Sequence, residues 1–352
     1  MSAASSKTGE RALFTGLMAG RLSSALPGSS PGMFLTSEAC ERAALPNLRN
    51  MLISIIIPTC NRNDLLAQCL DCLAPGKQKG GKIEGATSDS RSITASFTYE
   101  VIVTDDSSKS SAQEIIARDY PWVRWVAGPR RGPAANRNNG AKHARGEWLV
   151  FTDDDCLPNS EFLSAYWNAA VGNGALVLEG KTSPSGIRTR VDMECPANES
   201  GGNLWSCNMA IRKFLFFELE GFDCNFPGPA MEDTDLHVRL LKAGKVIKFV
   251  PEALVLHPWR QSRGISFCKL HSKSRGYFVA KHPETAGTVS LKSLSIDLAR
   301  RLFKQLPPIA LECKGRGLGR EVLLSFYTFY ASIAYSKKSN GSRPHGKAEA
   351  QT

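Results

Sequence analysis

Three adjacent acidic residues, Asp153, Asp154 and Asp155, directly follow the apolar run 148–152. Carboxylates packed side by side repel one another and raise one another's pKa unless a cation or water compensates. Clustered carboxylate oxygens are also the ligands that Mg²⁺ and Mn²⁺ prefer. The triplet therefore indicates a metal-binding site, with a solvated acidic turn or a helix N-cap as the alternative.

The elements around the triplet predict where it lies. The run 148–152 is typical of a buried strand, and two similar runs, 53–57 and 101–104, also end in polar residues. Helical patterns lie between these strands, at 65–73 and around 115–116. Strands that alternate with helices predict βαβ units and a parallel sheet. The three polar strand ends should then meet at one edge, where α/β sheets bind ligands.

A basic segment, 128–140, joins the second and third of these strands. Its glycines and prolines predict a turn, and a helical pattern follows over 134–144. A helix N-terminus close to Arg130, Arg131 and Arg137 suits a diphosphate. A basic surface loop is the alternative.

Asp233 lies in the segment 231–236, which opens an amphipathic helix ending at Gly244. Acidic residues in the first turn of a helix often serve only to cap it or to interact with its dipole. The functional interpretation is that Asp233 is a general base on an acceptor hydroxyl, with a pKa tuned by neighbouring carboxylates and a metal.

His257 ends the second of two strand-like runs, 246–250 and 253–257. A single histidine at such a place is often structural. A neutral imidazole could also complete a metal site that begins at Asp155, and the sequence leaves both interpretations open.

Composition limits the classes of function. The chain has 352 residues, 42% hydrophobic and 22% charged, which is enough for one large α/β domain with extensions. The net charge of +11 favours anionic partners, but no basic helix with groove-reading spacing occurs, so we expect no nucleic acid partner. The ten cysteines are scattered, and the pair Cys69 and Cys72 lies in an apolar helical pattern typical of core packing. Free cysteines in a chain of this size indicate a reducing, cytoplasmic location.

Three segments fall outside the strand and helix pattern. Residues 1–50 lack periodicity and a convincing signal peptide, so we expect them to be disordered or to precede the natural start near Met51. The Gly-, Lys- and Ser-rich stretch 76–98 predicts a flexible surface loop. We also expect the tail 339–352 to be disordered.

Beyond residue 260 the sequence predicts helices rich in Lys and Arg, at 265–280 and 291–306. The segment 322–335 is apolar and aromatic, but shorter than the ~20 residues that span a bilayer. Its basic flanks favour peripheral contact with the cytoplasmic face of a membrane through residues 318–338. Packing on the catalytic domain or on a second subunit is the alternative.

Taken in order, these segments resemble the family 2 glycosyltransferases of the GT-A fold over residues 52–259. Each motif is common singly, and the ordered set is specific. The motifs are Pro58-Thr59-Cys60-Asn61-Arg62, Asp105-Asp106-Ser107, Arg137-Asn138-Asn139-Gly140, Asp153-Asp154-Asp155, Asn208-Met209-Ala210-Ile211-Arg212, Gly221-Phe222-Asp223 and Glu232-Asp233-Thr234-Asp235-Leu236.

The resemblance implies an α/β fold, with a Rossmann-like, mostly parallel sheet flanked by helices over 51–260 and a helical extension over 261–338. It implies an inverting, metal-dependent transfer of a hexose or related sugar from a nucleoside diphosphate sugar to a hydroxyl. Polysaccharides, lipid-linked oligosaccharides and other cell-envelope glycans are the acceptors it suggests. The alternatives are a non-catalytic nucleotide-sugar-binding protein of this fold and a sugar-phosphate nucleotidyltransferase. The latter would be expected to carry a Gly-rich Arg-Lys loop after the first strand, which this sequence lacks there.

The matched positions imply donor and metal roles. The residues expected to contact the donor nucleotide are Thr59, Asn61, Asp106, Arg137, Asp153 and Asp154. Asp155 and Asp153 match the ends of the family's D-x-D motif, and Asp155 would bind Mn²⁺ or Mg²⁺. His257 matches a later metal ligand that only some members have.

The resemblance also implies catalytic and acceptor residues. Asp233 falls on the position of the catalytic base, with Glu232 beside it. Trp205 and Asn208 would line the acceptor side, where the ring of Trp205 could stack on a sugar or pack against the sheet.

Overall fold

The computed structural model describes residues 52–83 and 97–341, which form two compact units. Of the described residues, the first unit takes in 52–83, 97–186, 195–224 and 233–259, and the second takes in 187–194, 225–232 and 260–341. The expectations for residues 1–50 and for 342–352 lie outside the described residues. Residues 339–341 continue the last helix rather than beginning the tail.

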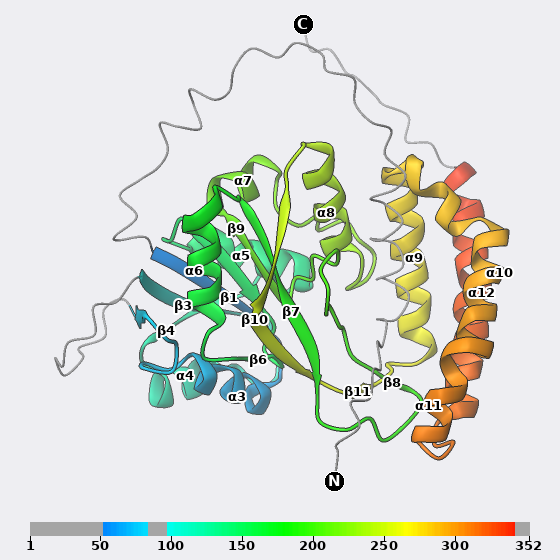
Figure 1. Ribbon diagram of the computed structural model, residues 1–352, viewed down its shortest axis with the longest axis horizontal. Coiled ribbons are helices and arrows are strands. Elements are labelled where there is room, and N and C mark those ends of the chain that lie inside the picture. Colours follow the sequence, from blue (N-terminus) through cyan, green and yellow to red (C-terminus); the bar gives the residue numbers. More distant parts are fainter. Residues whose placement is uncertain (1–51, 84–96, 342–352) are drawn as a thin grey trace, which may run out of the picture. The chain divides into compact units, whose positions relative to one another are not determined.

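A nine-stranded sheet forms the centre of the first unit (Figure 1). β1 pairs in parallel with both β3 and β5, whereas β9 runs antiparallel to β5 and β7. The expected mostly parallel sheet is confirmed. Its strand order is β2 (Gly81–Ile83), β3 (Phe97–Asp105), β1 (Leu52–Thr59), β5 (Trp148–Thr152), β9 (Asn208–Arg212), β7 (Val177–Ser185), β10 (Ile247–Pro258) and β6 (Leu157–Pro158), and β4 (Val123–Ala127) also pairs with β3.

Helices cover both faces of this sheet. Successive side chains of a strand point to opposite faces, so both faces carry apolar side chains that the helices bury. Ile55 and Ile57 pack in one apolar cluster, and Ile56 between them packs in the other. The first cluster receives side chains from α3 (Asn63–Leu73), α4 (Gln113–Asp119) and α6 (Phe162–Asn173). The second receives them from α5 (Pro133–His143), α7 (Lys213–Glu218) and α8 (Glu232–Lys242). Strands buried on both faces explain why the sequence runs are continuously apolar.

Three expected elements differ in detail. The two strands predicted at 246–250 and 253–257 are one strand, β10, whose register with β7 shifts between Val250 and Leu254. The stretch 76–98 contains the short strand β2, and its residues 84–96 lie outside the described part. The helix predicted at 291–306 is α-helical only to Arg300 and continues through a π-helical turn.

The second unit is mainly helical, and its longest helices, α9 and α12, pack together through Gly276 and the backbone of Tyr335. Asp192 is fully buried and accepts hydrogen bonds from Arg190, Gln261 and Arg320, which tie the segment 187–194 to α12. No helix among the described residues is long and apolar enough to cross a membrane. The elements are β8 (Met193–Glu194) paired with β11 (Arg260–Gln261), α9 (Ile265–Lys281), α10 (Leu291–Arg300), α11 (Leu306–Glu312) and α12 (Leu318–Gly341).

Candidate functional site

The polar ends of β1, β3 and β5 meet at one edge of the sheet, as the sequence predicts. Thr59, the last residue of β1, lies opposite Asp105, the last residue of β3. β5 runs parallel to β1 on its other side and leads directly into the acidic triplet. No disulfide joins the cysteines in the described part of the chain.

Asp154, the middle acid, points into the protein and is fully buried. Its Oδ2 accepts hydrogen bonds from Thr59 Oγ1 at 2.8 Å and from Arg62 Nε at 3.1 Å. The pKa of Asp154 is raised to about 7, mainly by burial and also by the charge of Asp155, against the attraction of Arg62. Thr59 and Asp154, both expected at the donor, are thus bonded to each other and hold β1 to the acidic turn.

Arg62 is the cation of this cluster, and it bridges two of the acids. It donates from Nη1 to Asp155 Oδ2 at 3.0 Å, in addition to its bonds with Asp154. Arg62 immediately precedes α3, so the first helix after β1 presents it to the triplet. No role for Arg62 was predicted from the sequence, although Arg62 is the last residue of the polar stretch after β1.

Asp153 pairs with a different cation. Arg137 Nη2 on α5 donates to Asp153 Oδ1 at 2.6 Å, and the Arg137 side chain is buried against the ring of Phe222. Burial alone would raise the pKa of Asp153, but the Arg137 guanidinium outweighs it and holds that pKa below its ordinary value. Asp153 is therefore an anion that fixes Arg137.

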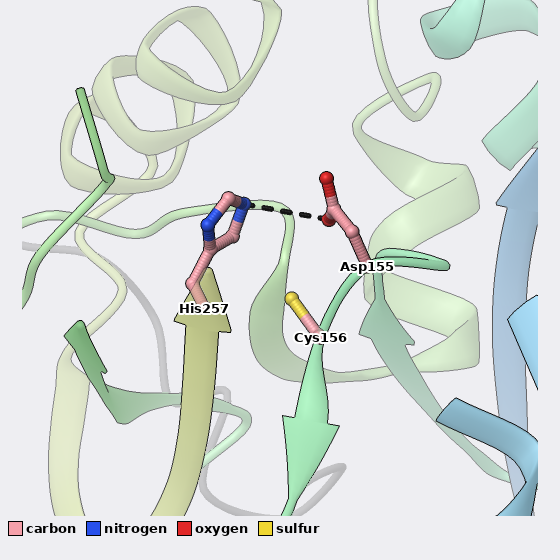
Figure 2. A group of neighbouring side chains, drawn as sticks. All are labelled: Asp155, Cys156 and His257. Carbon is pink, nitrogen blue, oxygen red and sulfur yellow. Dashed lines mark ion pairs between the residues drawn. The ribbon is translucent and has the colours of Figure 1, made fainter. Parts of the chain in front are cut away.

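Asp155 faces the end of β10. His257 Nε2 lies 3.4 Å from Asp155 Oδ1, and Cys156 lies beside both (Figure 2). The other ring nitrogen, Nδ1, is 2.9 Å from the carbonyl oxygen of Pro258. A carbonyl can only accept, so Nδ1 carries a hydrogen, and Nε2 is the ring nitrogen that faces Asp155.

This pair fits a divalent cation. A carboxylate oxygen and an imidazole lone pair repel each other at this distance unless a proton or a metal lies between them. Oxygen and imidazole donors suit Mn²⁺ and, with more oxygen ligands, Mg²⁺. The structure thus brings together Asp155 and His257, two of the three residues that the sequence proposed as ligands. The third, Asp153, pairs with Arg137.

The residues after β3 order a loop. Asp106 Oδ1 accepts from the backbone N–H of Arg130 at 2.8 Å. Burial raises the pKa of Asp106, although the amides of Arg130 and Gly132 oppose the shift. Asn61, at a φ of 54°, accepts from the backbone amides of Lys109 and Ser110. Both side chains therefore shape the loops where the base of the donor nucleotide is expected to bind.

Asp233 lies in the first turn of α8 and is half-buried. Its Oδ1 accepts from the amide of Thr234 at 2.7 Å. Burial raises the pKa of Asp233, and the nearby charges of Arg137 and Asp153 act on that pKa in opposite directions. The base candidate therefore belongs to the same electrostatic cluster as the Asp153–Arg137 pair. Glu232, beside it, is buried.

The two residues expected on the acceptor side are held by the protein itself. Asn208 Nδ2 donates to the carbonyls of Lys181 and Ala253, and its Oδ1 accepts from Tyr166 Oη at 2.6 Å. These bonds tie β9 to β7 and β10. Trp205 is half-buried against the first apolar cluster and donates from Nε1 to the carbonyl of Ala197.

Several known proteins are similar in sequence to this part of the chain. Residues 54–189 match the family model Glycosyl transferase family 2. The chain is 31% identical over 136 residues to the poly(ribitol-phosphate) beta-glucosyltransferase of Bacillus spizizenii, a match covering 37% of this chain and 19% of that protein. It is 29% identical over 277 residues to a validoxylamine A glucosyltransferase of Streptomyces hygroscopicus, covering 66% and 57%. The chain thus spans less than two thirds of either relative.

A solved structure shows the same fold. The mannosyltransferase PcManGT from Pyrobaculum calidifontis, determined with GDP-Man and Mn²⁺, superposes with a TM-score of 0.50 over 94% of both chains, at 17% sequence identity.

Proposed function

Because residues 54–189 match the family model Glycosyl transferase family 2, we propose that this chain transfers a sugar, with inversion, from a nucleoside diphosphate sugar to a hydroxyl acceptor. The main support for the proposal is that two groups of charged and polar side chains lie at one edge of the sheet. Asp155 and His257 form a cation site, while Arg137, Asp153 and Asp233 form one charge cluster. The named relatives are glucosyl- and mannosyltransferases, which supports a hexose donor.

Asp155 and His257 would hold the metal, Mn²⁺ or Mg²⁺, with Asp153 nearby in the D-x-D motif. When bound, the metal neutralises negative charge that develops on the leaving diphosphate. Mn²⁺ in the mannosyltransferase of the same fold supports this assignment. Arg62 already balances part of the charge of Asp154 and Asp155, which keeps the acids closely packed before a cation arrives.

We propose that the loops after β1 and β3 bind the nucleotide of the sugar donor. Asn61 and Asp106 shape these loops, and Asp106 holds the turn that contains Arg130. Arg137 points at the triplet and can serve the diphosphate, because a guanidinium binds phosphate oxygens in a fixed geometry. Thr59 and Asp154 position this wall rather than reaching the donor themselves, since each already binds the other.

Asp233 takes the acceptor proton in this proposal. Its raised pKa, caused by burial, brings the carboxylate closer to the working pH and makes it a better base. Single displacement needs no carboxylate nucleophile. The carboxylates of Asp153 and Asp154 are each engaged by an arginine, and Asp155 is assigned to the metal, so we assign proton transfer to Asp233 rather than to the triplet.

A donor screen tests the proposal. Purified protein is incubated with UDP- and GDP-hexoses in Mn²⁺ or in EDTA, and release of the nucleoside diphosphate is measured. We expect release from at least one donor, in Mn²⁺ only. No release together with metal-independent nucleotide binding would support a binding protein instead.

We also infer that the second unit docks on an anionic membrane surface, which suits a lipid-linked acceptor. Residues 260–338 contain 15 Lys or Arg and four Asp or Glu, a charge of +11 that equals the net charge of the whole chain. α12 exposes an apolar stripe at helical spacing: Leu323, Phe326 and Tyr330. Two copies facing each other through this unit would repel, whereas anionic lipid attracts it.

Vesicle sedimentation tests the membrane proposal. We expect binding to vesicles of phosphatidylglycerol and phosphatidylcholine that weakens with salt and with the combined change of Leu323, Phe326 and Tyr330 to Ser. Phe214→Ser, an exposed aromatic of the first unit, is the control and should leave binding unchanged. Salt-independent binding, or self-association lost in the triple variant, would contradict the proposal.

A further inference from the structure

Cys156 contributes a third donor atom at the cation site. A carboxylate oxygen of Asp155, the sulfur of Cys156 and a ring nitrogen of His257 all lie within 4.8 Å of one another, and all three residues are buried. Figure 2 shows the sulfur directed toward the space between the imidazole and the carboxylate. The proposed sugar transfer gives this thiol no task, because Mg²⁺ and Mn²⁺ prefer oxygen and nitrogen ligands.

The arrangement of these three donors suits a softer metal. Zn²⁺ is commonly held by Cys, His and carboxylate ligands in a tetrahedron. With bonds of ~2.0–2.1 Å, two oxygen or nitrogen ligands of such a tetrahedron lie about 3.3 Å apart, and Asp155 Oδ1 is 3.4 Å from His257 Nε2. One edge of the tetrahedron is therefore already formed, with the sulfur close by.

A second thiol near the ring occupies a different position. Cys195 Sγ lies 3.7 Å from Nδ1 of His257 and 3.3 Å from the carbonyl of that residue, whereas the cation site uses Nε2. Cys195 is therefore on the side of the imidazole that is hydrogen-bonded to Pro258, and it serves as a matched control.

We propose that Asp155, Cys156 and His257 form a zinc site that competes with the hard metal of the proposed function. Zn²⁺ bonds to the sulfur as the thiol proton passes to solvent. The ion then carries one carboxylate and one thiolate, so the centre has no net charge. A Mn²⁺ ion bound by Asp155 and neutral His257 keeps a charge of +1. The zinc form consequently attracts a diphosphate less, and Zn²⁺ inhibits.

Cobalt substitution tests the site without any sugar transfer. Co²⁺ is added to reduced full-length protein without nucleotide, and the near-ultraviolet sulfur-to-cobalt charge-transfer band is recorded. We expect the band in the wild type and in Cys195→Ala, its displacement by one equivalent of Zn²⁺, and its loss in Cys156→Ala. Zn²⁺ affinity should fall about tenfold or more in Cys156→Ala, while Mn²⁺ affinity should change less than about twofold.

The Mn²⁺ measurement also shows that Cys156→Ala is folded. A charge-transfer band that persists in this variant, or one absent from the wild type, would overturn the zinc site. The inhibitory consequence rests on the proposed function, but the spectrum does not. A cobalt–thiolate band with no sugar transfer would reject only the glycosyltransferase proposal, and transfer without the band would reject only the zinc site.

Discussion

Replacing Arg62 with Gln tests whether this residue stabilises the acidic turn. The change leaves Asp154, which is fully buried, and Asp155 without their shared cation. Removing one partner of a fully buried ion pair costs about 3–5 kcal/mol. The Arg62 side chain is 41% exposed, so water screens part of its charge. We therefore expect a loss of about 2 kcal/mol in the free energy of unfolding at pH 8, allowing for that screening.

The loss should depend on pH in a defined direction. The folded-state pKa of Asp154 is about 7, above its unfolded value, because burial disfavours the charge. Asp154 therefore favours folding at low pH, and this contribution is lost as pH rises through the folded pKa. Without Arg62 that pKa rises further, so the variant suffers most above pH 7. At pH 5.5 Asp154 is protonated in both proteins, and the difference should shrink to about 1 kcal/mol.

Urea unfolding of metal-free protein at the two pH values measures the effect. Arg118→Gln, which removes an exposed pair with Asp119, is the control and should leave the free energy of unfolding unchanged at either pH. Equal losses for Arg62→Gln at pH 5.5 and pH 8 would refute the assignment of Arg62 to the charge of Asp154.

Two further substitutions examine the scaffold of the site. In Gly140→Ala the new Cβ would lie 2.5 Å from Ile56 Cγ2, so we expect a loss of about 1–3 kcal/mol in stability, while Gly287→Ala, with open space around it, should be nearly neutral. Equal thermal unfolding midpoints for the two variants would contradict the tight packing of Gly140 on Ile56. In Asp105→Asn we expect the free energy of unfolding to fall by about 1.5–3 kcal/mol near pH 7, because the carboxylate accepts hydrogen bonds from the amide of Ala112 and the ring N–H of Trp125. Burial alone would raise the pKa of Asp105, but hydrogen bonds from Ser107, Ala112 and Trp125 outweigh burial and lower it. The stability that Asp105 contributes is therefore present above its unfolded-state pKa and is lost as pH falls through its folded-state pKa. A loss that stays constant down to pH 3 would count against it.

The edge of the sheet that carries the site could be predicted from sequence. Alternating strands and helices fix the direction of β1, β3 and β5, and acidic residues at the ends of two of them must then gather at one edge. The pairing of Asp155 with His257 was one of two interpretations that the sequence left open, and the other was a structural histidine. These inferences depend only on local pattern and on the parallel arrangement of strands.

The arginine partners of the three acids could not be predicted, because they depend on which distant side chains approach. Arg137 on α5 reaches Asp153, whereas Arg62 reaches Asp154 and Asp155. The sequence also gave no sign that the hydroxyl of Thr59 binds Asp154. A sequence pattern shows that a side chain is polar and near an edge; it does not show which partner satisfies it when buried.

The role of Asp233 as the general base is tested by a single-turnover measurement on Asp233→Asn in Mn²⁺, once a donor is identified. Donor affinity is measured in parallel by calorimetry and also reports the fold of the variant. We predict a donor Kd within about threefold of the wild type and a transfer rate at least about 100-fold lower, because the amide cannot accept the acceptor proton. An unchanged transfer rate would contradict the assignment of Asp233 as the base.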